Sequence, residues 1–167
     1  MLAKDPENDM ALQRQSVNRR MAARLAIEQG DAKRSLRFLE VLIPLHEARV
    51  AHDPGNTNWI EFRAWLMVDI ASAHLSLGEI DEARIAAREA MSQARRLSDT
   101  DPTVAGWALG ALCGASAVAS FAELDAGKSD AVRPIVAEMQ SRLDQARVKA
   151  ASSGDIARCA LRMAVVN

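Results

Sequence analysis

Apolar residues recur at helical spacing along most of the chain, and the pattern is clearest in its middle third. Large apolar side chains return every three or four residues from Trp59 up to Gly78, which is the period of one helix face. The sequence Asp-Pro-Gly-Asn at residues 53–56 precedes this segment, and such turn residues separate helices. The pattern therefore predicts a helix that Thr57 or Asn58 caps and that Gly78 ends.

The same reasoning predicts two helices in each third of the chain and a short helix after them. The partner of the middle helix opens at Glu79 or Asp81 and carries small apolar residues among its arginines. Pro44 is expected to kink the second predicted helix, because proline cannot donate a backbone hydrogen bond. The predicted helices cover about residues 5–29, 32–52, 57–77, 81–97, 102–126, 129–151 and 155–166.

A sequence repeat connects these pairs of helices. The dipeptide Asp-Pro occurs at residues 5, 53 and 101, so 48 residues separate each copy from the next. A glycine follows each copy at a nearly constant distance, at Gly30, Gly78 and Gly127. A fixed period of this kind indicates stacked units of secondary structure. We therefore expect a single domain, 1–167, built from units at about 4–52, 53–100 and 101–151 with a capping helix at 154–166.

Helix-forming residues dominate the composition. Hydrophobic residues make up 49% of the chain, aromatic residues only 4%, and tyrosine is absent, which favours helices over strands. We therefore predict an all-α protein with a buried core. The formal net charge of −1 gives no general attraction to nucleic acid or to an anionic membrane, so neither is an expected partner.

The two cysteines, Cys113 and Cys159, lie in apolar helical segments without the spacing of a known motif. Buried reduced thiols fit this pattern better than a disulfide, and reduced thiols are typical of the cytoplasm. The start of the chain also lacks the basic and apolar regions of a secretion signal. The chain is therefore predicted to be cytoplasmic.

One uncharged segment, residues 104–122, has the look of a membrane helix. It holds Gly106, Gly110 and Gly114 at four-residue spacing, as membrane helices that associate through small residues do. However, alanine and glycine rather than leucine dominate the segment, and acidic residues flank both of its ends. We therefore expect an enclosed helix of the stack whose glycines let its neighbours approach closely.

The residue types that carry catalysis or bind metals are present but scattered. His46, His52 and His74 have no second ligand at metal spacing, and no Cys-x-x-Cys pair exists. Residues 122–129 fit a relaxed phosphate-binding loop, but they follow a predicted helix and bring two acidic side chains to the phosphate position. The chain is therefore expected to have no catalytic activity and to bind no metal or cofactor.

The segment 78–83, Gly-Glu-Ile-Asp-Glu-Ala, resembles the turn between the two helices of a tetratricopeptide repeat (TPR). Ala71 and Ala90 match the small residues of that family at close helix contacts, although its usual period is 34 residues rather than 48. The Asp-Pro-Gly-Asn turn with Trp59 is similar to the long TPR-like repeats of bacterial multidomain proteins. The resemblance implies a right-handed α-solenoid that binds proteins or peptides.

In TPR-like proteins the first helix of each unit lines a concave groove. Mapped by distance from the turn glycine, the resemblance implies a groove lined by Val17, Arg20, Arg24 and Glu28, by Trp65, Asp69, Ser72 and Ser76, and by Ser116, Ser120 and Glu123. Arginines and short polar groups beside Trp65 suit an extended acidic peptide. The ligand of this non-catalytic scaffold is thus expected to be a protein or peptide.

Two other functions stay open. The apolar end at residues 164–166 and the start at a repeat boundary indicate open stacking faces, which suit self-association, as a homo-oligomer or within a larger multidomain signalling protein. A closed cavity near Trp65, Asp69 and His74 would instead favour a sensor of small ligands.

Overall fold

The structure is a computed structural model that describes residues 9–101, 104, 106–148 and 153–164, and these residues form helices and turns without any strand. The prediction of an all-α fold is confirmed. The predicted helix ends near residues 5, 102, 151 and 166 lie outside the described residues. The helices are α1 (Asp9–Glu28), α2 (Ala32–Glu40), α3 (Ile43–His52), α4 (Thr57–Leu77), α5 (Ile80–Thr100), the π-helix η1 (Trp107–Leu112), α6 (Cys113–Asp125), α7 (Ser129–Val148) and α8 (Ser153–Ala164).

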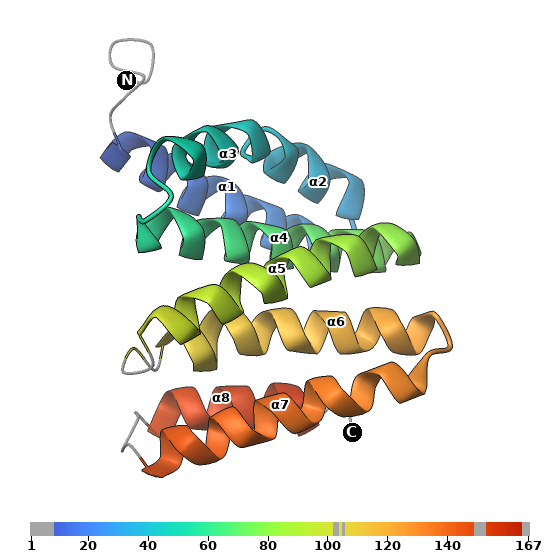
Figure 1. Ribbon diagram of the computed structural model, residues 1–167. Helices are drawn as coiled ribbons and strands as arrows, with labels where there is room; N and C mark the ends of the chain where they lie inside the picture. The colour runs from blue at the N-terminus through green and yellow to red at the C-terminus, as the bar shows by residue number, and fades with distance from the viewer. Residues whose placement is uncertain (1–8, 102–103, 105, 149–152, 165–167) are drawn as a thin grey trace.

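Helices that follow one another in the chain pack as pairs, and each pair contacts the next (Figure 1). The pairs are α1 with α2, α4 with α5, and α6 with α7. Helices α1, α2 and α3 also contact α4, while α5 contacts α6, and α8 packs on α6 and α7. In Figure 1 the elements therefore descend in chain order from α1–α3 at the top to α7 and α8 at the bottom.

The three turn glycines share one backbone conformation. Gly30, Gly78 and Gly127 have φ values of 78°, 74° and 71°, in the left-handed region that a side chain disfavours. In each turn the next residue donates its backbone N–H to the carbonyl five residues before it, at 2.8, 3.0 and 2.8 Å: Asp31 to Ala26, Glu79 to His74 and Lys128 to Glu123. This bond closes a Schellman turn. The repeated glycines thus mark three equivalent helix ends.

Replacing Gly78 with alanine is expected to lower the free energy of unfolding by about 1 kcal/mol, because alanine must adopt the same positive φ. Gly55 is the matched control, since its φ lies outside the left-handed range and only an Asp53 oxygen comes within 4 Å of an added Cβ. Gly55→Ala should leave stability unchanged or raise it. Urea unfolding of both variants measures the difference, and equal effects would contradict the explanation.

The second predicted helix is in fact two helices. The segment 32–52 divides into α2 and α3 at Val41 and Leu42, and Pro44 lies in the first turn of α3. Proline is tolerated there because the first helical N–H groups have no partner within the helix. Leu42 is fully buried at the break. The proline therefore begins a helix instead of kinking one.

Two further differences concern the helices that follow. Asn56, not Thr57 or Asn58, caps α4, and its side-chain oxygen accepts the N–H of Trp59 at 3.4 Å. In the third unit, the first helix contains the π-helical segment η1 before α6 begins. Periodicity of apolar residues does not distinguish a π-helical turn from an α-helical one at this length.

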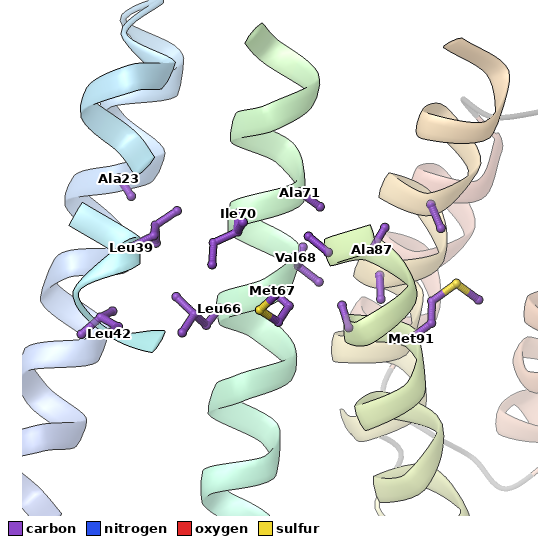
Figure 2. Close-up of a cluster of buried hydrophobic side chains, with 14 residues drawn as sticks. Ala23, Leu39, Leu42, Leu66, Met67, Val68, Ile70, Ala71, Ala87 and Met91 are labelled. Carbon is purple, nitrogen blue, oxygen red and sulfur yellow. The ribbon is translucent and has the colours of Figure 1, made fainter. Parts of the chain in front are cut away.

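Helix α4 supplies the centre of the larger hydrophobic core and is buried on two sides (Figure 2). Leu66 and Ile70 point toward Leu39 of α2 and toward Leu42, which lies between α2 and α3. On the other side, Val68 and Ala71 face α5. A second cluster lies between η1, α6, α7 and α8, and it includes Leu109, Leu112, Met139, Leu143 and Met163. Each helical pair therefore buries its apolar surface against its neighbours.

The two cysteines are buried as expected, but the prediction of reduced thiols is wrong, because Cys113 of α6 and Cys159 of α8 form a disulfide. Their Cα atoms are 5.8 Å apart, within the normal range. The packing of α8 on α6 brings together residues that are 46 positions apart in sequence. The two cysteines therefore give no indication of a reducing compartment.

In the part of the chain that the structure describes, no helix combines the length and hydropathy needed to span a bilayer. The uncharged segment that resembled a membrane helix instead contributes to η1 and α6 inside the helical stack.

Candidate functional site

A cavity of about 330 Å³ opens between the first helices of the three pairs and α8. Cavities of this size bind small molecules or individual side chains of a partner. Four helices contribute to the wall: Arg24, Ile27 and Glu28 from α1, Trp65, Val68, Asp69 and Ser72 from α4, Gly114, Ala117 and Val118 from α6, and Arg162 from α8. The lining combines apolar side chains with the charged side chains of α1, α4 and α8.

Two arginines of α1 converge on one carboxylate of α4. The Nε of Arg20 lies 2.6 Å from one oxygen of Asp69, and the Nε of Arg24 lies 2.9 Å from the other. The side chains of Asp69 and Arg20 are only 5% and 11% exposed, so their ion pair lies largely out of solvent, whereas Arg24 is 45% exposed. Burial lowers the pKa of Arg20, and the charge of Asp69 opposes this change. The shared carboxylate fixes α1 relative to α4 beside the cavity.

Both arginines also cover the ring of Trp65. The guanidinium carbon atoms of Arg20 and Arg24 lie 5.6 and 5.8 Å from the ring centroid, within range of a cation–π interaction. The six-membered ring of the indole also lies close to two glycines. A Cβ atom at Gly114 would lie 3.1 Å from Trp65 Cζ3, and one at Gly110 would lie 3.4 Å from Cζ2. Two of the three spaced glycines therefore make room for the indole, and Trp65 is held in one orientation.

Trp65 also lines a second cavity of about 430 Å³ with Gln13, Arg20, Asn58, Glu61 and Phe62. A third cavity, of about 390 Å³, shares Gln13 and Phe62 with the second and is otherwise lined by Met10, Arg14, Val17 and Asn18. The three cavities therefore adjoin one another along α1 and α4. From Asn58 to Ser72 the α4 wall spans 14 residues, or about 21 Å of helix.

The site residues expected from the first two units lie mostly along this row of cavities. Arg24, Glu28, Trp65, Asp69 and Ser72 line the first cavity, Arg20 lines the second and Val17 lines the third. Ser76 is exposed and lines none of the three, and its hydroxyl donates to the carbonyl of Ser72 at 2.9 Å.

The residues expected from the third unit do not line any of the three cavities. Ser116 and Ser120 are fully buried, and Glu123 is buried beside Arg84 of α5, with Arg84 Nε 3.0 Å from a Glu123 oxygen. Helix α6 packs against α4, α5, α7 and α8, and these three side chains are buried within that packing.

Counting back from Gly127 by the same number of residues as in the second unit identifies the face of α6 that lines the first cavity. Trp65 lies 13 residues before Gly78, and the residue 13 before Gly127 is Gly114, which does line the first cavity. The residues expected from the third unit, Ser116, Ser120 and Glu123, lie at other distances from Gly127 than the corresponding residues of the first two units do from their glycines. For Arg162 the repeat offers no signal, because α8 follows the last unit.

The histidines lie apart from the cavities. His74 Nδ1 is 2.6 Å from a carboxylate oxygen of Glu79 at the end of α4, and His74 does not line the cavity beside Trp65 and Asp69. His46 is buried, with its Nε2 2.9 Å from the hydroxyl oxygen of Ser16. Among the described residues, no group of three or more histidine, cysteine, aspartate or glutamate side chains could hold a metal ion.

Comparison with protein-family models, with curated proteins and with solved structures found no match to this chain.

Proposed function

We propose that the chain is a right-handed, TPR-like α-solenoid of three helical hairpins and a capping helix, and that it binds an extended peptide segment of a partner protein without catalysing a reaction. The observation that carries this proposal is the row of three adjoining cavities along α1 and α4. The three matching glycine turns support the repeat arrangement.

The dimensions of the groove favour a peptide over a small molecule. An extended chain advances about 3.3 Å per residue, so a groove of about 21 Å accommodates about six residues. Each cavity combines apolar side chains with an arginine, which is Arg14 beside Met10 and Val17, Arg20 in the second cavity and Arg24 in the first. A peptide can present a different side chain to each cavity, whereas one small ligand would fill only one of them.

Trp65 is the expected centre of the binding energy, because aromatic residues in partly enclosed positions dominate many interfaces. It lines two of the three cavities, and its ring is already held by Arg20, Arg24 and Gly114. A side chain that is fixed before binding loses little conformational entropy when the ligand arrives.

The test is selection from a displayed library of random hexapeptides, followed by calorimetry on the strongest binder. Trp65→Ala is expected to weaken that binding at least about tenfold, because it removes the aromatic wall that two cavities share. Phe38→Ala is the matched control, since Phe38 is also covered by an arginine, Arg34 at 5.5 Å, but lines none of these cavities. The affinity of the Phe38→Ala variant for the peptide should stay within about twofold of that of the original protein.

Failure to select any peptide would contradict the proposal, as would equal affinity for the Trp65→Ala variant. Unfolding curves of both variants show whether a loss of affinity merely follows a loss of structure.

Self-association is the second candidate, and exposed apolar side chains on α1 favour it. Met10, Val17, Met21 and Leu25 are all more than one third exposed, and large exposed apolar patches are often interfaces. Sedimentation of the peptide-free protein over a range of concentrations distinguishes the two functions. A monomer at every concentration would remove this candidate and leave peptide binding unaffected.

A further inference from the structure

Helix α8 contributes a basic side chain to the first cavity. Arg162 lines the first cavity together with Arg24, which comes from α1 at the opposite end of the chain. The Nη1 atom of Arg162 would lie 3.7 Å from a Cβ at Gly114, so its guanidinium group rests against the bare backbone of α6. The same glycine contacts Trp65. Both arginines therefore border a cavity whose wall also holds the indole, several apolar side chains and the polar side chains of Glu28, Asp69 and Ser72.

The wall of this cavity carries two arginines, Arg24 and Arg162, and two carboxylates, Asp69 and Glu28. Asp69 is already shared by the Nε groups of Arg20 and Arg24. Within the described ranges, no carboxylate forms an ion pair or hydrogen bond with Arg162. Loss of solvent, followed by the positive charges of Arg24 and Arg158, lowers the pKa of Arg162. Positive charge that lowers the pKa of a neighbouring arginine also stabilises a bound anion.

We propose that Arg24 and Arg162 together bind a carboxylate of the partner peptide, placed beside the Trp65 ring. This inference rests on the proposed peptide-binding function and names the chemistry of one end of the ligand. A guanidinium group presents parallel N–H donors that match the two oxygens of a carboxylate. Trp65, Ala117 and Val118 add an apolar wall for the carbon atoms next to that carboxylate.

Glu28 determines which kind of anion fits best. Its exposed side chain lines the same cavity as Arg24 and Arg162. A nearby like charge disfavours any bound anion, and it does so more strongly for a doubly charged phosphate than for a singly charged carboxylate. The site therefore suits a carboxylate, which is either an acidic side chain or the end of a peptide chain.

The direct test follows the arginine Nε–Hε signals by NMR while N-acetylleucine is added. This probe carries one carboxylate beside an apolar group, and N-acetylleucinamide is its uncharged counterpart. We expect N-acetylleucine at millimolar concentration to shift the signals of Arg24 and Arg162, and the amide to leave them unchanged. Inorganic phosphate is added in a separate titration and should bind more weakly than the carboxylate.

Three variants are expected to change the affinity for N-acetylleucine in different ways. Arg162→Gln should weaken binding of N-acetylleucine about tenfold, because one of the two cations is lost. Glu28→Gln should strengthen it, because a like charge is removed from the cavity wall. Arg37→Gln changes an exposed arginine of α2, a helix that does not line the cavity, and should alter affinity by less than about twofold.

Equal shifts with the acid and its amide would overturn the inference, as would an unchanged affinity in Arg162→Gln or tighter binding of phosphate. The peptide selection separates this failure from failure of the proposed function. If hexapeptides bind at Trp65 but show no enrichment of acidic residues or of a free carboxyl end, the groove stands and the carboxylate site does not.

Discussion

Replacing Leu66 with alanine is expected to lower the free energy of unfolding by about 2–5 kcal/mol. Leu66 is fully buried at the centre of α4, where it points toward Leu39 and Leu42. The substitution removes apolar contacts and leaves a cavity that helices packed on both sides of α4 cannot easily fill. Chemical denaturation of the original protein and of Leu66→Ala measures the loss of stability.

Leu161 provides a control with the same chemical change. Its side chain is 69% exposed on α8, so Leu161→Ala should change stability by no more than about 0.5 kcal/mol. If Leu66→Ala and Leu161→Ala lowered the free energy of unfolding by similar amounts, burial of α4 in the core would not explain the effect.

Acidification from pH 7 toward pH 4 is expected to destabilise the fold through His46. This side chain is 1% exposed. Burial first, and then the positive charges of Arg63 and Arg20, lower its pKa from 6.5 to about 4. The edge of the imidazole packs against Trp59, with ring centroids 5.6 Å apart. The folded state therefore prefers the neutral imidazole.

Because the pKa is lower in the folded state, the contribution of His46 is fully present above the unfolded pKa of about 6.5. It is lost as the pH falls from there toward about 4, since the unfolded chain binds the proton first. The difference between the two pKa values corresponds to about 3 kcal/mol.

Urea unfolding at a series of pH values, for the original protein and for His46→Gln, isolates this contribution from that of the carboxylates. The difference in stability between the two proteins should shrink or reverse as the pH falls through this window. His52→Gln changes an exposed histidine at the end of α3 and should keep the original pH profile. A constant difference between the original protein and His46→Gln would show that His46 is not the responsible group.

Local features of the fold could be predicted because each has a local cause. Gly78 ends a helix because its backbone adopts a conformation that other residues avoid, and the same argument located the ends at Gly30 and Gly127. The apolar period from Trp59 onward matched α4 because one side chain in every three or four must face a neighbour.

Features that depend on contacts between distant segments could not be predicted. The disulfide requires Cys113 and Cys159 to meet across two packed helices, and no spacing rule covers a separation of 46 residues. The break at Leu42 also depends on tertiary structure, because the buried leucine fills the core where α2 and α3 separate.

The candidate site likewise includes residues that could be predicted from the sequence and residues that could not. Arg24 and Trp65 could be placed on one surface because each belongs to a repeated unit. Ser116 and Ser120 were misplaced because a two- or three-residue difference in offset turns a helical position to another face. Arg162 was missed because only the folding of α8 against α6 brings it to the cavity.

If Arg162 contacts the ligand as proposed, the bond between Cys113 and Cys159 is expected to couple the oxidation state of the protein to its ligand affinity. Cys113 precedes Gly114 in the chain, and Cys159 lies one helical turn before Arg162. Such linkage acts in both directions. A ligand that keeps Arg162 in place also keeps the sulfur atoms together, so an occupied groove should protect the bond from dithiothreitol. Samples purified with and without a reductant are therefore expected to differ in ligand affinity.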